Sequence, residues 1–367
     1  MHTLLSYVLG NSTGSGAMRS EHLFRLGKVA LRINHMRKPE TRDIVRRLLV
    51  IPPERIILKN LLSRNPSTAF NPTIRMSKGE IKVYTRIITG YYTYSSAIAE
   101  FTLKLDDIYE GVHEKIEAEV TITPESEVDF WGTEDPRITT INEREFITYT
   151  GRTRWFFEGK VNRTVPIVAE RRGGIWTRRF YLKLPPLLDQ IVSLNKDAFI
   201  QVLDDKVLHV FHRPIFETSP PSLWHGTLSL EVLDREKFRE EIIMDNELVM
   251  FPADFERNVG WGAPLLKIDD RYIAIVHARG VDEVYRLYSL LLTLEGDSLE
   301  IAGVSETYIM EPREIYERYG DRPNVVFICG AEVMEDRVLI SYGAADHVVA
   351  FGEIELSELV NSIREIK

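Results

Sequence analysis

Several features that define large classes of proteins are scarce or absent in this sequence. Cys329 is the single cysteine among 367 residues, so an intrachain disulfide is excluded and a reducing compartment is indicated. No apolar run is long enough to span a membrane. The formal net charge is −9 and no polybasic run is present, which argues against nucleic acids and anionic membranes as partners. We therefore expect a cytoplasmic protein that binds neither.

The signatures of common cofactor and metal sites are also missing. The Gly-Ser-Gly at 14–16 has no strand before it and no third glycine after it, so it is not a dinucleotide fingerprint. The chain has no phosphate-loop consensus, no paired-cysteine zinc pattern and no His-Glu-x-x-His. Its histidines are scattered. We expect neither a metal nor an organic cofactor.

The residues that are present predict a β-rich protein. Hydrophobic residues make up 44% of the chain, which is enough for a sizeable core. From about residue 66, short runs rich in β-branched and aromatic residues alternate with turn residues, as in strands joined by tight turns. We assign residues 65–367 to a β-rich catalytic domain that ends in a short helix, predicted from the amphipathic pattern of 356–367.

The first 64 residues have a different pattern. Residues 1–17 are rich in Gly, Ser, Asn and Thr near their end, and we expect them to be flexible. In the following segment, 18–62, Ile44, Val45, Leu48 and Leu49 fall on one face of a helix. We therefore predict a flexible N-terminus and a helical extension over residues 1–64.

A recurrence runs through the β-rich part. Five strand-like runs each end at a charged residue, and a second strand-like run follows. The five residues are Arg86, Arg152, Arg213, Arg279 and Asp346, at intervals of 66, 61, 66 and 67 residues. An even period of this size is typical of a repeat architecture, and five repeats of paired strands predict a five-bladed β-propeller. The alternative is a series of antiparallel hairpins in a sandwich, where these charges would cap strands at the surface.

The sequence Glu134-Asp135-Pro136-Arg137 is the strongest candidate for a catalytic site. Two adjacent carboxylates are costly to bury without a partner or a substrate. Because Asp135 precedes a proline, its backbone is biased to an extended and stiff conformation, which suits a general acid that must be held in place. A structural ion pair between Asp135 and Arg137 explains the same residues equally well.

Other charged and aromatic residues are candidates for an anion site and a sugar site. Arg86, Arg152, Lys196 and His212 stand at or near matching repeat positions and could together bind a polyanion, although each alone is more often a solvated surface group. His277, Tyr285 and Asp346, in the fourth and fifth recurrences, are residue types that contact sugars. Core packing is an equal explanation for Tyr285.

These motifs together resemble glycoside hydrolase family 130, the inverting β-mannoside phosphorylases and their hydrolytic relatives. The resemblance covers about residues 65–355, and its most specific pieces are EDPR, NVVF and YGAAD. The matching segments are FNPTI (70–74), VYTR (83–86), GTEDPRIT (132–139), TYTGR (148–152), NKDA (195–198), FHRP (211–214), GWGAP (260–264), VHARG with YRLYS, PNVVFICG (323–330) and SYGAADH (341–347). The family fold is a five-bladed propeller.

The resemblance implies a reaction and a role for each matched residue. Asp135 would be the general acid, and inorganic phosphate would attack the anomeric carbon and give α-mannose 1-phosphate. Phosphate would be a co-substrate and not a cofactor. The residues implied to bind phosphate are Arg86, Arg152, Lys196 and His212. Those implied to bind the mannose-containing oligosaccharide are Asn71, Glu134, Arg137, Asp197, Arg213, His277, Tyr285 and Asp346.

Two other functions stay open from the sequence. One is a β-mannosidase on the same scaffold, in which acids would replace the basic residues on the side of the nucleophile. The other is a non-catalytic propeller that binds glycans. The retained basic residues favour phosphorolysis. We also expect a homo-oligomer. The Val and Ala in VHARG depart from the family pattern, and so put the contacts to the acceptor sugar in doubt.

Overall fold

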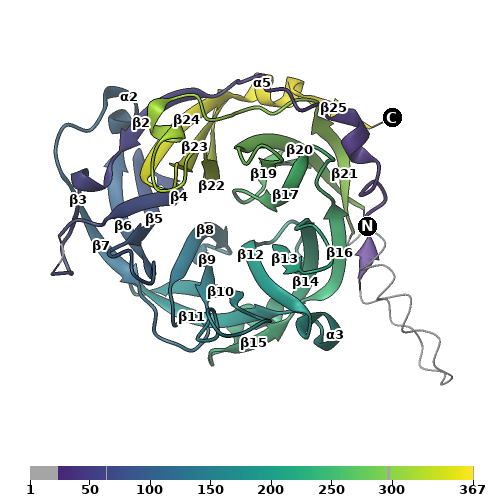
Figure 1. Ribbon diagram of the computed structural model, residues 1–367, viewed down its shortest axis with the longest axis horizontal. Helices are drawn as coiled ribbons and strands as arrows, with labels where there is room; N and C mark the ends of the chain where they lie inside the picture. Colours follow the sequence, from purple (N-terminus) through teal and green to yellow (C-terminus); the bar gives the residue numbers. More distant parts are fainter. Residues whose placement is uncertain (1–23, 63, 296–297, 367) are drawn as a thin grey trace.

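The computed structural model describes residues 24–62, 64–295 and 298–366. Its strands form five sheets arranged radially around a central axis, as Figure 1 shows. Within each sheet the strands follow one another from the axis outward, and strands that succeed one another in the chain pair antiparallel. The five-bladed β-propeller predicted from the sequence recurrence is confirmed. We number the blades I to V in the order in which their innermost strands occur in the chain.

Each blade is built outward from one innermost strand. Blade I contains, from the inside outward, β4 (Thr68–Ser77), β5 (Glu80–Ile88), β6 (Ser96–Lys104) and β7 (Ile116–Ile122). Blade II contains β8 (Thr133–Ile141), β9 (Arg144–Arg152), β10 (Thr164–Arg172), β11 (Ile175–Lys183) and β15 (Arg239–Ile242). Blade III contains β12 (Val192–Gln201), β13 (Val207–Phe216), β14 (Leu223–Ser229) and β16 (Met244–Met250). Blade IV contains β17 (Glu256–Trp261), β19 (Arg271–Gly280), β20 (Tyr285–Glu295) and β21 (Ser298–Ser305), with β18 (Leu266–Ile268) also paired to β19. Blade V contains β22 (Val326–Met334), β23 (Arg337–Ala344), β24 (Val348–Glu355) and β2 (Arg46–Ile51).

The described helices are short and connect or flank the blades. They are η2 (Ile33–Met36), η3 (Pro53–Arg55), α2 (Leu105–Glu110), α3 (Pro186–Asp189), η4 (Leu230–Asp234), α4 (Ile315–Arg318) and α5 (Leu356–Asn361). No helix in the described part of the chain has both the length and the apolar character needed to cross a bilayer.

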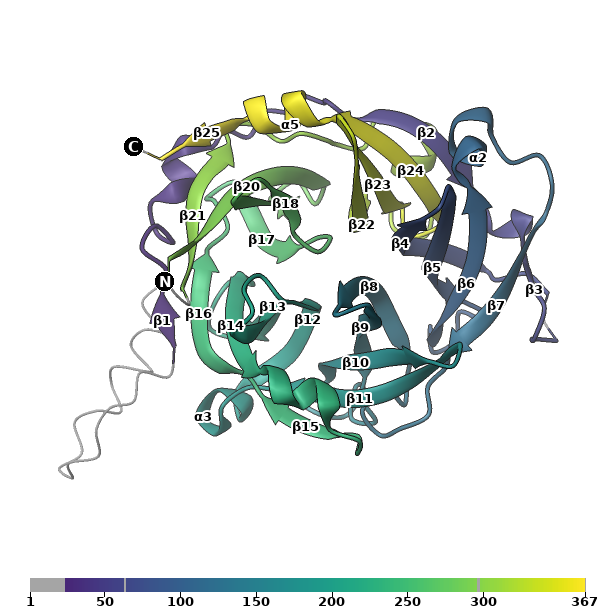
Figure 2. The ribbon, with the colours of Figure 1, turned by 180° about the vertical axis from the view of Figure 1, so that it is seen from behind.

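Our prediction of a helical extension at 18–62 is wrong for the described residues 24–62. This segment runs around the outside of the propeller and adds outer strands to three blades (Figure 2). The strands are β1 (Arg25–Leu26) on β16, β2 on β24 and β3 (Ile56–Leu58) on β7. The hydrophobic spacing fits a helix, but backbone pairing with existing blade edges overrides it. The flexible segment expected at 1–17 lies outside the described residues.

Blade V closes the ring of blades with strands from the N-terminal and the C-terminal parts of the chain. Blade V takes three strands from near the C-terminus, and β2 pairs with β24 as its outermost strand. The predicted C-terminal helix is confirmed as α5, but it ends at Asn361 and the chain continues into β25 (Ile363–Glu365), which pairs with β21 of blade IV. The described segments at both ends of the chain therefore connect neighbouring blades.

The core lies between blades. Five of the buried hydrophobic clusters each join two adjacent blades, so that every blade packs on both of its neighbours. In the cluster between blades III and IV, for example, Phe199 and Phe211 of blade III pack against Trp261 of blade IV. Because both faces of each blade are covered, strands such as β4 and β8 are buried at nearly every position near the axis.

Candidate active site

A repeated irregularity in three inner strands places polar side chains near the axis. Asn71 in β4, Asp135 in β8 and Asp197 in β12 have φ values of 51°, 52° and 50°. Each lies where the pairing with the next strand shifts register. Asn and Asp tolerate this left-handed conformation better than most residues, and such bulges turn a side chain in a new direction. Blades I, II and III therefore each contribute one residue at an equivalent position.

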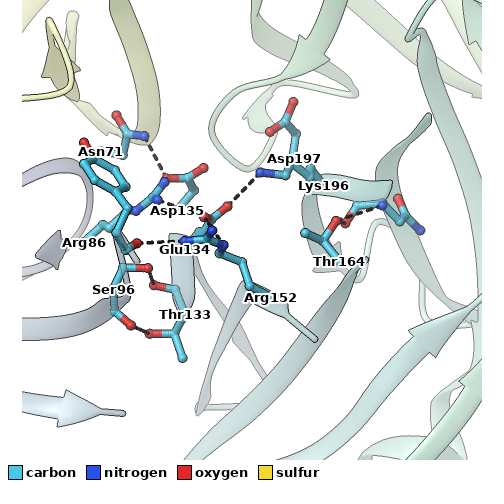
Figure 3. Close-up of polar contacts among 12 residues, drawn as sticks. Asn71, Arg86, Ser96, Thr133, Glu134, Asp135, Arg152, Thr164, Lys196 and Asp197 are labelled. Atoms are coloured by element: carbon cyan, nitrogen blue, oxygen red, sulfur yellow. Dashed lines mark hydrogen bonds and ion pairs between the residues drawn. The ribbon is translucent and has the colours of Figure 1, made fainter. Parts of the chain in front are cut away.

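Asp135 contacts residues of blade I. Its Oδ1 accepts a hydrogen bond from Asn71 Nδ2 at 2.8 Å and one from Arg86 Nη1 at 3.1 Å, as Figure 3 shows. Asp135 is 7% exposed and Asn71 is 3% exposed. Two neighbouring donors thus fix the orientation of a nearly buried carboxylate, which is the arrangement a positioned acid or base requires.

Glu134, next to it, is surrounded by cations. Its Oε1 accepts from Arg86 Nη2 at 2.8 Å, and its Oε2 accepts from Lys196 Nζ at 2.7 Å (Figure 3). Arg152 Nε lies 3.6 Å from Oε1. Burial alone would raise the pKa of Glu134, but Arg86, Lys196 and Arg152 outweigh it and lower that pKa to about 2. Glu134 is therefore ionised and holds three cations from three different blades.

Arg152 also contacts a backbone carbonyl and an aromatic ring. Its Nη1 donates to the carbonyl of Tyr94 at 2.7 Å, and its guanidinium lies 3.9 Å from the centre of the Phe156 ring. Burial lowers the pKa of Arg152 from its usual value, and Arg86 and Arg163 add to this effect while Glu134 opposes it. Arg154 instead forms an exposed pair with Glu127, so the structure identifies Arg152 as the arginine of this stretch that joins the cluster.

A second group of charges lies around Asp197. Arg213 Nε donates to Asp197 Oδ2, and His277 Nε2 lies 3.2 Å from the same oxygen. Burial opposes ionisation, but Arg213, His277 and Arg137 hold the pKa of Asp197 well below its usual value. A Cβ on Gly260 would collide with both Asp197 and His277, so glycine is required for this close approach.

We expected Arg137 to contact the substrate, but its guanidinium binds backbone carbonyls. It is fully buried, and its guanidinium donates to the carbonyls of Gly262 at 2.6 Å, Asp135 at 2.9 Å and Trp261 at 3.0 Å. Its Nη2 also lies 3.7 Å from Asp197 Oδ1. These contacts favour a positioning role, because Arg137 connects the backbone of the candidate acid in blade II to blades III and IV.

His212 is not joined to the cation cluster by any contact in the described part of the chain. It is fully buried in blade III, and its Nδ1 lies 3.3 Å from Asn195 Oδ1. Burial lowers the pKa of His212 to about 3, so the imidazole is neutral at pH 7. The structure thus brings together Arg86, Arg152 and Lys196 of the expected phosphate-binding residues, and leaves His212 apart.

Asp346 and Tyr285 lie on the side of blades IV and V. Burial raises the pKa of Asp346 to about 6, with Arg86 and Arg322 opposing the rise and Asp135 adding to it. These influences place Asp346 in the electrostatic field of the same cluster. Tyr285 is nearly buried, and its ring lies 4.6 Å from the Arg322 guanidinium. In the described residues, no three His, Cys, Asp or Glu side chains are grouped as metal ligands.

Sequence reasoning missed one residue at this site and a group of aromatic residues beside it. The sequence reasoning did not single out Tyr94, which lies between β5 and β6 of blade I. Its hydroxyl contacts Asp321, in the segment before β22 of blade V. Nor did the sequence reasoning single out the aromatic residues that flank the motifs, Phe130 and Trp131 before EDPR and Phe156 and Phe157 after TYTGR. The signal was available, since exposed-loop aromatics next to a charged motif are typical of binding sites.

Comparison with known proteins finds relatives of the chain among mannoside phosphorylases. Residues 35–365 match the family model of glycoside hydrolase family 130, described as β-1,4-mannooligosaccharide phosphorylase. The 1,2-β-oligomannan phosphorylase of Thermoanaerobacter sp. (strain X514) is 29% identical over 238 residues, which are 64% of this chain and 72% of that protein. The β-1,2-mannobiose phosphorylase of the same strain is 30% identical over 231 residues, 61% of this chain and 67% of that protein.

A solved structure supports the same fold. The β-1,2-mannobiose phosphorylase of Listeria innocua, in complex with β-1,2-mannobiose, superposes with a TM-score of 0.68 at 17% sequence identity. The match covers 87% of this chain and 98% of that structure. Since the family model also spans most of the sequence, the chain belongs to glycoside hydrolase family 130.

Proposed function

We propose that this protein is an inverting β-mannoside phosphorylase, which cleaves a short β-mannosyl oligosaccharide with inorganic phosphate. The proposal rests on how three cations lie around two adjacent carboxylates. Arg86 contacts both Asp135 and Glu134. Lys196 and Arg152 also contact Glu134. A single oriented carboxylate thus lies next to a cluster of cations. The family to which the chain belongs supports the same reaction.

In the proposed reaction, Asp135 supplies the proton and phosphate supplies the nucleophile. A phosphate oxygen forms a bond to the anomeric carbon of mannose on one face while the bond to the glycosidic oxygen breaks on the other. The proton of Asp135 reaches the departing oxygen, in this family through the 3-hydroxyl of the mannose. The products are α-mannose 1-phosphate and a shortened sugar, and the reaction is reversible.

The charge of the cluster supports phosphate over water as the nucleophile. Arg86, Arg152 and Lys196 contribute three positive charges, whereas Glu134 contributes one negative charge and Asp135 carries the proton that it donates in the proposed reaction. The cluster therefore keeps a positive excess, which suits an incoming anion. An inverting hydrolase instead needs a second carboxylate to activate water. Phosphate is already an anionic nucleophile and needs only to be held.

The relatives favour a β-1,2-linked substrate. Both curated relatives are named for β-1,2-linked mannosides, whereas the family model is described for β-1,4-linked ones. We propose β-1,2-linked mannobiose or a longer β-1,2-mannoside as the substrate, in the cytoplasm, where inorganic phosphate is available.

One residue favours the hydrolase as the second candidate. Asp346 is a second carboxylate: burial raises its pKa to about 6 and Asp135 adds to the rise, and an acid in that position could activate water. The two functions differ in their need for phosphate.

The experiment that separates them is incubation with β-1,2- and β-1,4-mannobiose, with and without phosphate. The phosphorylase gives mannose 1-phosphate only in the presence of phosphate. Equal release of free mannose in both reactions would identify a hydrolase and refute the proposal.

A further inference from the structure

Four aromatic side chains form a continuous strip on two loops of blade II. Phe130 and Trp131 lie in the loop between β7 and β8, and Phe156 and Phe157 lie in the loop between β9 and β10. Neighbouring rings meet edge to face, with centroid distances of 5.1 Å from Phe130 to Trp131, 5.2 Å from Trp131 to Phe157 and 5.1 Å from Phe157 to Phe156. We call these four residues the aromatic strip.

Two rings of the strip are exposed although they are apolar, and the other two, Trp131 and Phe156, are half-buried. Phe130 is 51% exposed and Phe157 is 55% exposed. Contiguous apolar surface of this kind is uncommon on soluble proteins and marks binding sites more often than isolated exposed residues do. Since the rings are only partly buried, their exposed faces are accessible to a ligand.

The strip is held in place by hydrogen bonds. Trp131 Nε1 donates to the carbonyl of Arg154 at 3.1 Å, and the Trp131 amide donates to the carbonyl of Arg152 at 2.9 Å. Arg163 Nε donates to the carbonyl of Phe156 at 2.7 Å. A preorganised apolar surface loses little conformational entropy when a ligand binds to it.

The strip is continuous with the candidate active site. The Arg152 guanidinium lies 3.9 Å from the ring centre of Phe156 and 5.5 Å from that of Phe157. Nε of the same guanidinium lies 3.6 Å from Glu134 Oε1. Both loops also join the same end of the β8–β9 hairpin, where Thr133 pairs with Gly151. Thr133 is two residues before Asp135 in the sequence. A ligand that leaves the site over Arg152 would therefore meet the strip next.

We propose that the aromatic strip binds additional mannose units of a longer β-mannoside, beyond the two units at the cleaved bond. The inference rests on the proposed function. The C–H face of a pyranose packs on an aromatic ring, and the two exposed rings of the strip, Phe130 and Phe157, offer such surfaces along one line. The strip is a single file of rings, bordered by the exposed Glu127–Arg154 pair. This shape suits a narrow polar-edged chain better than the broad face of a protein partner.

The test compares substrates of different length. The wild-type protein and Phe130→Ala are assayed with β-1,2-linked mannobiose and mannotetraose, and in parallel with the β-1,4-linked pair. Phe130 is the ring of the strip farthest along the series from Arg152, so its removal leaves the site itself intact. We expect kcat/KM for mannotetraose to fall about fivefold to tenfold and kcat/KM for mannobiose to change less than about twofold. Phe157→Ala, in the middle of the strip, should lower kcat/KM more for mannotetraose than for mannobiose, with some loss for both because its ring also lies 5.5 Å from the Arg152 guanidinium.

A matched control and a binding measurement complete the test. Phe238→Ala removes another partly exposed ring, beside Tyr181 on the outer part of blade II, and should leave both substrates unaffected. Calorimetric titration of mannotetraose without phosphate measures the strip independently of catalysis, and Phe130→Ala should weaken binding by a similar factor.

The outcomes separate the inference from the proposed function. If wild-type protein cleaves no mannoside but Phe130→Ala still weakens mannotetraose binding, the proposed function fails and the strip is supported. The inference is overturned if phosphorolysis is confirmed but both Phe130→Ala and Phe157→Ala leave two quantities unchanged. These are the ratio of kcat/KM for mannotetraose to kcat/KM for mannobiose, and the Kd for mannotetraose. Absence of both cleavage and mannotetraose binding in the wild-type protein would overturn both.

Discussion

Asn71 and Asp135 occupy equivalent bulges on neighbouring inner strands, and the Asn71 amide donates to the Asp135 carboxylate at 2.8 Å. Blade I thus fixes the orientation of the candidate acid on blade II. Blade V sets the position of Asn71 in turn, because a Cβ on Gly343 would collide with the Asn71 side chain and backbone. Three blades therefore determine where one carboxylate points.

Replacing Asn71 by Ala should impair catalysis through this contact. The variant leaves Asp135 with Arg86 as its remaining side-chain donor among the described residues, so the carboxylate loses part of its orientation. We expect kcat to fall about tenfold or more, since small misplacements of catalytic groups are costly. Steady-state phosphorolysis of mannobiose measures this effect.

Gly343→Ala provides an independent test of the same contact. It keeps Asn71 but forces its side chain to move, and should reduce kcat in the same direction. Unchanged kcat in both variants would show that Asn71 does not position Asp135.

Replacing Lys196 by Ala should act mainly on phosphate. Lys196 Nζ binds Glu134, and its side chain remains 22% exposed, so it is accessible to an incoming anion. Loss of a charge-assisted hydrogen bond of about 1.5–3 kcal/mol corresponds to a rise of roughly tenfold to a hundredfold in the KM for phosphate. The KM for mannobiose should change much less.

The matched control for this variant is Lys59→Ala. Lys59 forms an exposed pair with Glu117 at 3.0 Å on the outer edge of blade I, so its removal should leave both KM values unchanged. An equal rise in the KM for both substrates in Lys196→Ala would argue against a specific phosphate contact.

The buried ion pair between Arg37 and Glu256 should be essential for stability. Arg37 donates to both Glu256 oxygens, at 2.9 and 2.7 Å, and both side chains are almost fully buried. Arg37→Ala leaves Glu256 buried without its cation, which costs about 3–5 kcal/mol of the free energy of unfolding. Denaturant unfolding of the purified variant measures this loss.

Arg46→Ala is the control for the ion pair within the same N-terminal segment. The Arg46 side chain is 68% exposed in its pair with Glu353, and exposed pairs contribute about 1 kcal/mol or less. Similar losses of stability in both variants would contradict the distinction between the buried and the exposed pair.

His212 predicts a specific dependence of stability on pH. Its pKa is about 3 in the folded protein and near 6.5 in an unfolded chain, so the unfolded state binds the extra proton between these values. The stabilisation is present above pH 6.5 and is lost as the pH falls. Between pH 6 and 5, His212 should contribute a loss of about 1.4 kcal/mol per pH unit.

His212→Gln should reduce this slope by that amount. His113→Gln, which replaces an exposed histidine, should leave the slope unchanged. Identical slopes for wild-type protein and His212→Gln would contradict the neutral, buried state of His212.

The sequence predicted the repeats and the acid motif because both depend on local patterns. Arg86, Arg152, Arg213, Arg279 and Asp346 all fall in or just after the second strand of a blade, so their even spacing revealed the propeller. The Asn-Pro and Asp-Pro pairs at 71–72 and 135–136 mark the repeated bulges. Asp135 could therefore be predicted as the candidate acid without a structure.

Other features depend on residues far apart in the sequence and could not be predicted. The pattern around Leu48 and Leu49 fits a helix, but pairing with β24 makes it a strand. His212 carries the same motif signal as Arg213, yet the two side chains contact different partners, Asn195 and Asp197. The burial of Arg137 likewise requires the carbonyls of Trp261 and Gly262, which a local motif does not reveal.

The central claim is that Asp135 protonates the leaving sugar while the cations of the cluster hold phosphate. Phosphorus NMR of the wild-type protein with β-1,2-mannobiose and phosphate tests it most directly, with Asp135→Asn in parallel. We expect a growing signal of α-mannose 1-phosphate, slowed by about 10²–10⁴-fold in the variant. Free mannose formed at the same rate with and without phosphate, or an Asp135→Asn variant as active as the wild type, would contradict the claim.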